Sequence, residues 1–92
     1  MENPVKQWLD KLDLNTRVTI ELRLDRVEEG NLGNCESVGK GIYELKIYLG
    51  PGYRIYFVKI GLQVILLLCA GNKRSQKKDI LKAQKYYKDY KI

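Results

Sequence analysis

The chain has 92 residues, enough for one domain around a single core, and its 45% apolar and 30% charged residues are typical of a folded protein. It contains no histidine, no apolar run of membrane-spanning length and no signal-peptide pattern at its start. These features exclude histidine-dependent catalysis and a transmembrane helix. They predict a cytoplasmic protein that does not act at a membrane.

The net charge of +6 is concentrated near the C-terminus. Residues 1–70 carry equal numbers of basic and acidic side chains, whereas residues 71–92 carry eight Lys or Arg and two Asp. A basic segment on a neutral body favours binding to a polyanion or to an acidic partner. The alternative is a solvated helix face rich in lysine, and the charge alone does not decide between them.

The first predicted element is a short helix. Asn3 as N-cap and Pro4 at the first helical position are typical of a helix start. The apolar residues that follow at helical spacing are Val5, Trp8, Leu9 and Leu12. This pattern predicts a helix that ends near residue 11 or 12, followed by a turn over residues 13–15.

A second helix is predicted over residues 16–29, and Gly30 is placed to end it as a C′ glycine. Its apolar side chains form a wide stripe made of Val18, Ile20, Leu22, Leu24 and Val27. Two consecutive amphipathic helices favour a helical hairpin, and we expect it to pack on the apolar face of a sheet.

Residues 31–40 lack periodicity and are interrupted by glycines, which predicts a connecting loop. Lys40 in this loop could touch a ligand or be an ordinary surface lysine. Cys35 lies in the loop and Cys69 in a predicted buried strand, so we expect two reduced thiols rather than a disulfide. Two cysteines without histidine also make a poor metal site.

Residues 42–49 and 53–59 alternate between apolar and polar side chains, and Gly50-Pro51-Gly52 separates them. This pattern predicts an antiparallel hairpin with a three-residue loop in which Leu49 pairs with Tyr53. The other expected partners are Ile47 with Ile55, Leu45 with Phe57, Tyr48 with Arg54, and Lys46 with Tyr56. The hairpin would then carry two cations and two tyrosines on one open face and its apolar side chains on the other.

A strand is predicted over residues 63–70, and because the run VILLLCA after Gln63 is apolar, we expect a central strand covered on both faces. Residues 71–74 form a basic turn, and a last helix is predicted from Ser75 as N-cap to Tyr90. The expected inner stripe of that helix is Ile80, Ala83, Tyr87 and Tyr90. The predicted fold class is therefore α+β, with two N-terminal helices, a three- to four-stranded antiparallel sheet and a C-terminal helix.

Three stretches of the chain carry a resemblance to a known superfamily. They are GNLGNCESVGKGIYELKI, GPGYRIYF and LLLCAGNKRSQKKDI. In this order and at these spacings they resemble the RelE/ParE superfamily of type II toxin–antitoxin toxins, in particular the HigB-like addiction module killer proteins. The resemblance spans roughly residues 3–90 and implies one RelE-like domain over residues 1–92. Relatives usually place a β-strand ahead of the Asn-Pro pair, and the expectation is that this strand is missing here.

The resemblance also implies an activity. The RelE branch cleaves mRNA on the ribosome without a metal ion, by attack of the 2′-OH on the adjacent phosphate, which leaves a 2′,3′-cyclic phosphate and a 5′-OH. A protein of this kind needs no cofactor. Its expected partners are mRNA on the ribosome and a cognate antitoxin, most often a helix-turn-helix protein.

Carried over by resemblance, the catalytic residues are Lys46, Arg54 and Lys73. Lys46 is the candidate base, because a lysine beside other cations has its pKa lowered. Arg54 would hold the phosphate bidentately, and Lys73 or Arg74 would face the scissile phosphate or the leaving group. Further RNA contacts are expected from Tyr48, Tyr56, Arg74, Lys77 and Lys78.

Other interpretations stay open at this stage. Arg54 could instead form a structural ion pair with Glu44, which stands where RelE has a second lysine on the first hairpin strand. Where active relatives often carry Tyr or His, this chain has Asp79. The alternative functions are a ParE-like, non-enzymatic inhibitor of DNA gyrase and an inactive RNA-binding relic. The fold is the same for all of these functions and does not choose among them.

Overall fold

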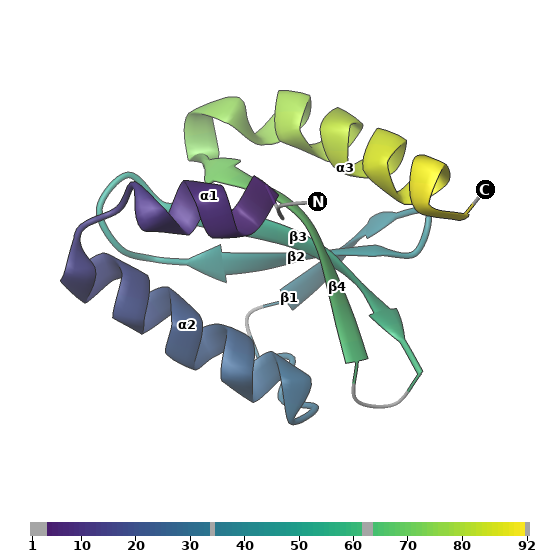
Figure 1. Ribbon diagram of the computed structural model, residues 1–92. Helices are drawn as coiled ribbons and strands as arrows, with labels where there is room; N and C mark the ends of the chain where they lie inside the picture. The colour runs from purple at the N-terminus through teal and green to yellow at the C-terminus, as the bar shows by residue number, and fades with distance from the viewer. Residues whose placement is uncertain (1–3, 34, 62–63, 92) are drawn as a thin grey trace.

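The computed structural model describes residues 4–33, 35–61 and 64–91. The elements in chain order are α1 (Pro4–Asp10), α2 (Leu14–Glu28), β1 (Cys35–Gly39), β2 (Ile42–Ile47), β3 (Tyr53–Ile60), β4 (Val64–Asn72), the 3-10 turn η1 (Lys73–Ser75) and α3 (Gln76–Lys91). The strands form one antiparallel sheet in the order β1-β2-β3-β4 (Figure 1). The predicted α+β fold class is confirmed. None of the helices in these ranges is long and apolar enough to cross a membrane.

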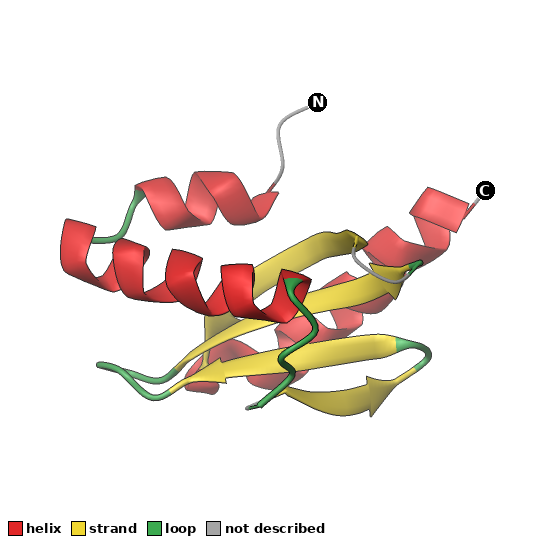
Figure 2. Cartoon of the chain, turned by 90° about the horizontal axis from the view of Figure 1, so that it is seen from below, coloured by secondary structure: helices red, strands yellow, loops and turns green. Residues whose placement is uncertain are grey.

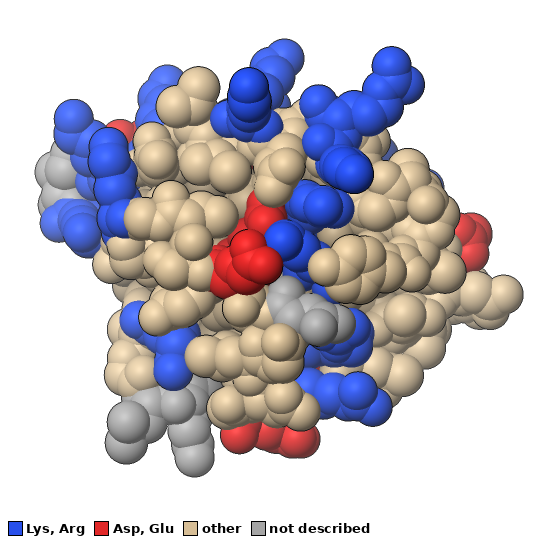
Figure 3. Space-filling view, turned by 180° about the vertical axis from the view of Figure 1, so that it is seen from behind, with Lys and Arg blue, Asp and Glu red and all other residues tan. Residues whose placement is uncertain are grey.

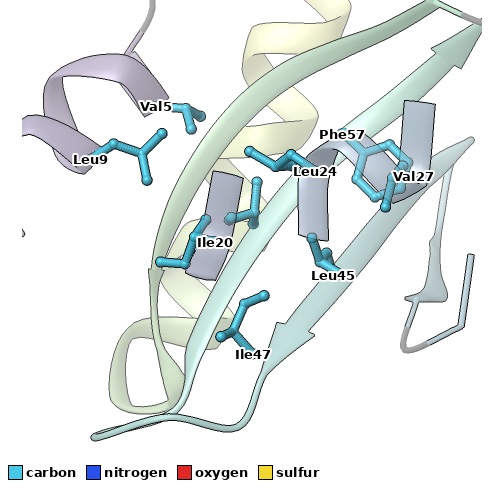
Figure 4. Close-up of a cluster of buried hydrophobic side chains, with 9 residues drawn as sticks. Val5, Leu9, Ile20, Leu24, Val27, Leu45, Ile47 and Phe57 are labelled. Atoms are coloured by element: carbon cyan, nitrogen blue, oxygen red, sulfur yellow. The ribbon is translucent and has the colours of Figure 1, made fainter. Parts of the chain in front are cut away.

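The sheet has helices on both faces (Figure 2). Helices α1 and α2 cover one face, and the larger cluster of buried side chains there is Val5, Leu9, Ile20, Leu24, Val27, Leu45, Ile47, Ile55 and Phe57 (Figure 4). Helix α3 covers the other face over a smaller cluster made of Ile42, Tyr56, Val58, Leu68, Cys69 and Ala83. The expectation of an open second face is therefore wrong, because α3 lies on it.

Helix α2 begins earlier than the sequence predicted because Asp13 caps it. The Asp13 carboxylate accepts hydrogen bonds from the Thr16 backbone N–H at 3.1 Å and from Thr16 Oγ1 at 2.7 Å. These bonds lower the pKa of Asp13 and satisfy N–H groups at the helix start. The predicted cap of α1, Asn3, lies outside the described residues.

The apolar stripe of α2 is narrower than predicted. Ile20, Leu24 and Val27 are buried, whereas Val18 and Leu22 are exposed. Two residues along a helix correspond to a rotation of about 200°, so side chains two positions from Ile20 point away from the sheet. A continuous apolar pattern thus contains both a core face and a solvent face.

Strand β1 lies within the segment that was predicted to be a loop. It pairs antiparallel with β2, and Gly39 is the partner of Ile42. The two residues between them, Lys40 and Gly41, have φ of 56° and 80°, as a type I′ hairpin turn requires. The strand was missed because it is short, lies at the sheet edge and has no fully buried side chain among its five residues.

The β2–β3 register differs by two residues from the predicted one. Leu45 pairs with Ile55 and Ile47 pairs with Tyr53, so the connecting loop is residues 48–52 rather than 50–52. Leu49 has left the strand, and its carbonyl accepts a hydrogen bond from the Gly52 N–H at 3.0 Å. Because side chains alternate with a period of two, a shift of two leaves every side chain on its predicted face.

Strand β4 is at the end of the strand order, so the prediction that it is central is wrong. Both of its faces are nonetheless covered, as the apolar run predicted. Leu67 and Ala70 pack on the α1–α2 side, whereas Leu68 and Cys69 belong to the cluster under α3. The pairing with β3 shifts between Tyr56 and Phe57, which places two consecutive β4 residues on the same side.

Candidate functional site

Three segments meet at the loop between β2 and β3. Lys46 of β2 and Arg54 of β3 are direct partners across the two strands. The carbonyl oxygen of Gly52 accepts one hydrogen bond from Arg54 Nη1 at 3.3 Å and another from the Lys73 backbone N–H at 2.8 Å. The structure therefore brings Lys46 and Arg54 together on the face of the sheet that α3 covers, and it places the backbone of Lys73 beside the same loop.

Arg54 is largely buried, with 7% of the residue exposed. Its Nε lies 3.9 Å from Glu44 Oε2, which is an ion-pair distance but too long for a direct hydrogen bond. Among the described residues, Arg54 Nε has no hydrogen-bond partner. The ion pair with Glu44 that the sequence left open is thus present, and it leaves one donor of the guanidinium unused.

Glu44 is the centre of a buried polar network. The residue is 1% exposed, and Oε2 accepts hydrogen bonds from Tyr56 Oη and from Gln76 Nε2, each at 2.8 Å. With Arg54 nearby, one carboxylate joins β2, β3 and the first residue of α3. A buried carboxylate is tolerated only with such donors. Sequence reasoning placed Glu44 on an open polar face and so missed this role.

Tyr56 is fully buried, so its ring cannot stack on an RNA base, and the expectation of an RNA contact there is wrong. Burial raises the pKa of the Tyr56 hydroxyl, and the hydrogen bond to Glu44 raises it further. The phenol therefore stays protonated and acts as a fixed donor to Glu44. Tyr48, the other predicted aromatic contact, is 74% exposed beyond the end of β2.

Lys46 has a different partner from the one predicted. Its Nζ lies 3.0 Å from Glu36 Oε1 on the neighbouring strand β1. This hydrogen bond raises the pKa of Lys46, with further contributions from the charge of Glu36. The sequence expectation was a lowered pKa, and it is wrong because β1, which carries Glu36, was taken for a loop. In this arrangement Lys46 is a fixed cation rather than a general base.

The remaining predicted cations lie where β4 passes into α3. Lys73, Arg74, Lys77 and Lys78 are all exposed. Asn72 holds this turn: its Oδ1 accepts hydrogen bonds from the N–H groups of Arg74 and Ser75, and its own N–H donates to Ser75 Oγ. Figure 3 shows acidic and basic side chains side by side in the middle of this side of the molecule, with further basic side chains around its rim.

Asp79 is buried beside the same turn and accepts a hydrogen bond from Ser75 Oγ. Gly71 of β4 packs directly against it, since a Cβ built at Gly71 would lie 1.9 Å from Asp79 Oδ2 and 2.6 Å from Ser75 Oγ. Asp79 is therefore part of the packing between β4 and α3.

We expect Gly71→Ala to lower the free energy of unfolding by about 2–3 kcal/mol, because a new methyl group would have to displace a buried carboxylate. Urea denaturation followed by circular dichroism measures the effect. Gly33→Ala is the matched control, since that position has no positive φ and its Cβ would meet only Asn31 Oδ1, at 3.4 Å. Adding Asp79→Ala to Gly71→Ala should recover part of the loss, and a double variant as unstable as the sum of the two single variants would contradict this packing.

Neither cysteine is in a disulfide: Cys35 and Cys69 are free, and burial raises the pKa of Cys69 to about 12. Within residues 4–33, 35–61 and 64–91, no three or more His, Cys, Asp or Glu side chains gather in a way that could hold a metal ion.

A four-stranded antiparallel sheet with two helices on one face, one on the other and a cluster of cations at a hairpin loop agrees with a small toxin-like protein of the RelE/HigB type. The chain belongs to the family "Phage derived protein Gp49-like (DUF891)", whose model matches residues 7–88. It is 42% identical over 78 residues to an uncharacterized protein of Haemophilus influenzae, covering 84% of this chain and 79% of that protein. No solved structure matches.

Proposed function

We propose that this protein is the toxin of a type II toxin–antitoxin system and cleaves mRNA on the ribosome. Membership of a toxin-like family supports the toxin role. The observation that supports RNA cleavage is the direct pairing of Lys46 with Arg54 beside the Gly52 carbonyl, to which the backbone of Lys73 is also bound. We propose that a phosphate binds beside Lys46, Arg54 and Lys73, where their positive charges would stabilise it.

In the proposed reaction the ribose 2′-hydroxyl gives its proton to water, and its oxygen bonds to the adjacent phosphorus. The bond from phosphorus to the 5′-oxygen then breaks, and that oxygen takes a proton from water to become the 5′-OH. The phosphorane between these states carries additional negative charge. Arg54 is proposed to stabilise that charge through its guanidinium, which is positively charged and can donate hydrogen bonds to a phosphate. Lys46 is proposed as a second fixed charge and Lys73 as the cation nearest the leaving oxygen. Arg74, Lys77, Lys78 and Tyr48 are proposed to contact flanking nucleotides.

The proposed partners are mRNA on the ribosome in the cytoplasm and an antitoxin, for which a helix-turn-helix protein is the expected class. An antitoxin segment that covers the basic turn at the start of α3 would be acidic, and its binding would weaken as salt is added.

The test is primer extension on a ribosome-bound message incubated with the purified protein. We expect discrete cuts that persist in EDTA and products that carry a 2′,3′-cyclic phosphate. The same protein should be tested for inhibition of supercoiling by DNA gyrase. Inhibition of gyrase without RNA cleavage would replace the proposal with the ParE-like function, and absence of both activities would indicate an inactive relative.

A further inference from the structure

A hollow of about 450 Å³ lies between the C-terminal half of α3 and the turn that joins β1 to β2. Lys40 of that turn lines one side, and Lys85, Lys88 and Lys91 of α3 line the other. Figure 1 shows the yellow end of α3 next to this hairpin. Tyr87 supports the contact, since a Cβ at Gly41 would lie 3.6 Å from its ring. Two elements distant in sequence thus build one lysine-rimmed depression.

The depression is positively charged and has an apolar floor. Its remaining lining residues are apolar, Ile42, Leu81 and Tyr87, apart from one glutamine. Leu81 is 66% exposed, so its side chain is accessible to a ligand in the hollow. Within the described parts of the chain, no carboxylate forms an ion pair with any of the four lysines. Four ammonium groups without a carboxylate partner, around an apolar floor, are complementary to an anion that carries an apolar group.

Lys40 adds a second and independent observation. Its φ of 56° is the only positive φ among the described non-glycine residues. The first position of a type I′ turn favours Asn, Asp or Gly, and a lysine there is strained. The residue is therefore poorly suited to its backbone position, yet its side chain lines the hollow. Backbone strain of this kind is more common at binding sites than elsewhere.

We propose that this hollow binds an acidic peptide segment of a partner protein, with one aliphatic side chain of the peptide seated on Leu81 and its carboxylates paired with the surrounding lysines. A nucleic acid fits less well. The Tyr87 ring already has Lys91 Nζ 4.1 Å from its centroid, so that face is not free for a base, and no arginine lines the hollow to hold a phosphate bidentately. Lys85 and Lys88 lie about 14 to 18 Å along α3 from Gln76, and the proposed site does not depend on RNA cleavage.

The probe is the synthetic peptide Ac-EELEELEELE-NH₂, titrated into the full chain labelled with ¹⁵N and followed by NMR. We expect shifts at the backbone amides of Lys40, Leu81, Lys85 and Lys88. Exchanging Lys85 and Lys88 together for glutamine should weaken binding at least tenfold, whereas the matched exchange of Lys6 and Lys11, exposed on the other side of the sheet, should leave the affinity unchanged. The peptide with glutamine in place of glutamate should bind at least tenfold more weakly.

Lys40→Asn separates binding from folding. Asparagine suits the turn, so the midpoint of thermal unfolding should stay the same or rise while peptide affinity falls. Equal affinities for the Lys85/Lys88 and Lys6/Lys11 variants would overturn the proposal, because binding would then follow net charge alone. A single-stranded RNA decamer that shifts the same amides at lower concentration than the peptide would also overturn it, in favour of a nucleic-acid site.

Discussion

Arg54→Ala is expected to slow mRNA cleavage on the ribosome by about a hundredfold to a thousandfold, the usual cost of removing one charge-stabilising donor. The guanidinium makes its strongest interactions when the phosphorane carries additional charge, so its loss falls on the chemical step. Primer extension at saturating ribosome-bound message measures that step. Because Arg54 is buried beside Glu44, the substitution also leaves a carboxylate without its cation, and cleavage must be compared at protein concentrations corrected for the folded fraction.

Two variants control this experiment. Arg54→Lys keeps a positive charge and should recover little activity, since one ammonium cannot replace a planar fork of donors. Lys59→Ala removes a cation from the same strand at an exposed position outside the cluster and should cleave like the wild type. Undiminished cleavage by folded Arg54→Ala would end the proposed role of this residue.

The sequence predicted the faces of the hairpin better than its register. Strict alternation in β2 and β3 assigns each side chain to a face, and any shift by an even number of residues preserves that assignment. Lys46 and Arg54 therefore share a face, as predicted. The register depends on where the strand ends, and Leu49 looks like a strand residue although it belongs to the loop. One apolar residue in the loop was enough to change every expected pair.

The partners of the cations could not be read from the sequence because they come from tertiary packing. Glu36 reaches Lys46 only because residues 35–39 form a strand, and that strand has no buried alternation to reveal it. Gln76 reaches Glu44 only because α3 folds back over the sheet. The sequence did leave open an ion pair between Glu44 and Arg54, but it did not reveal that Glu44 is buried and also accepts hydrogen bonds from Tyr56 and Gln76.

The second large effect is expected at Glu44. Glu44→Ala should lower the free energy of unfolding by about 3–5 kcal/mol, the usual cost of removing one partner of a buried ion pair. It leaves the Arg54 guanidinium buried without a carboxylate, and it removes the acceptor of two hydrogen bonds, from Tyr56 and Gln76. Urea denaturation followed by circular dichroism measures the change.

The controls for Glu44 distinguish a buried network from a surface charge. Glu36→Ala removes an exposed carboxylate from the same face and should stay close to the wild type. Glu44→Gln keeps an acceptor oxygen for Tyr56 and should lose less than Glu44→Ala. Replacing Glu44 and Arg54 together by leucine should recover much of the stability, because an apolar pair needs no hydrogen bonds.

Equal stability of Glu44→Ala and Glu36→Ala would mean that the network contributes nothing. A large loss confined to Glu44 would show that one carboxylate both supports Arg54 and holds the start of α3 against the hairpin.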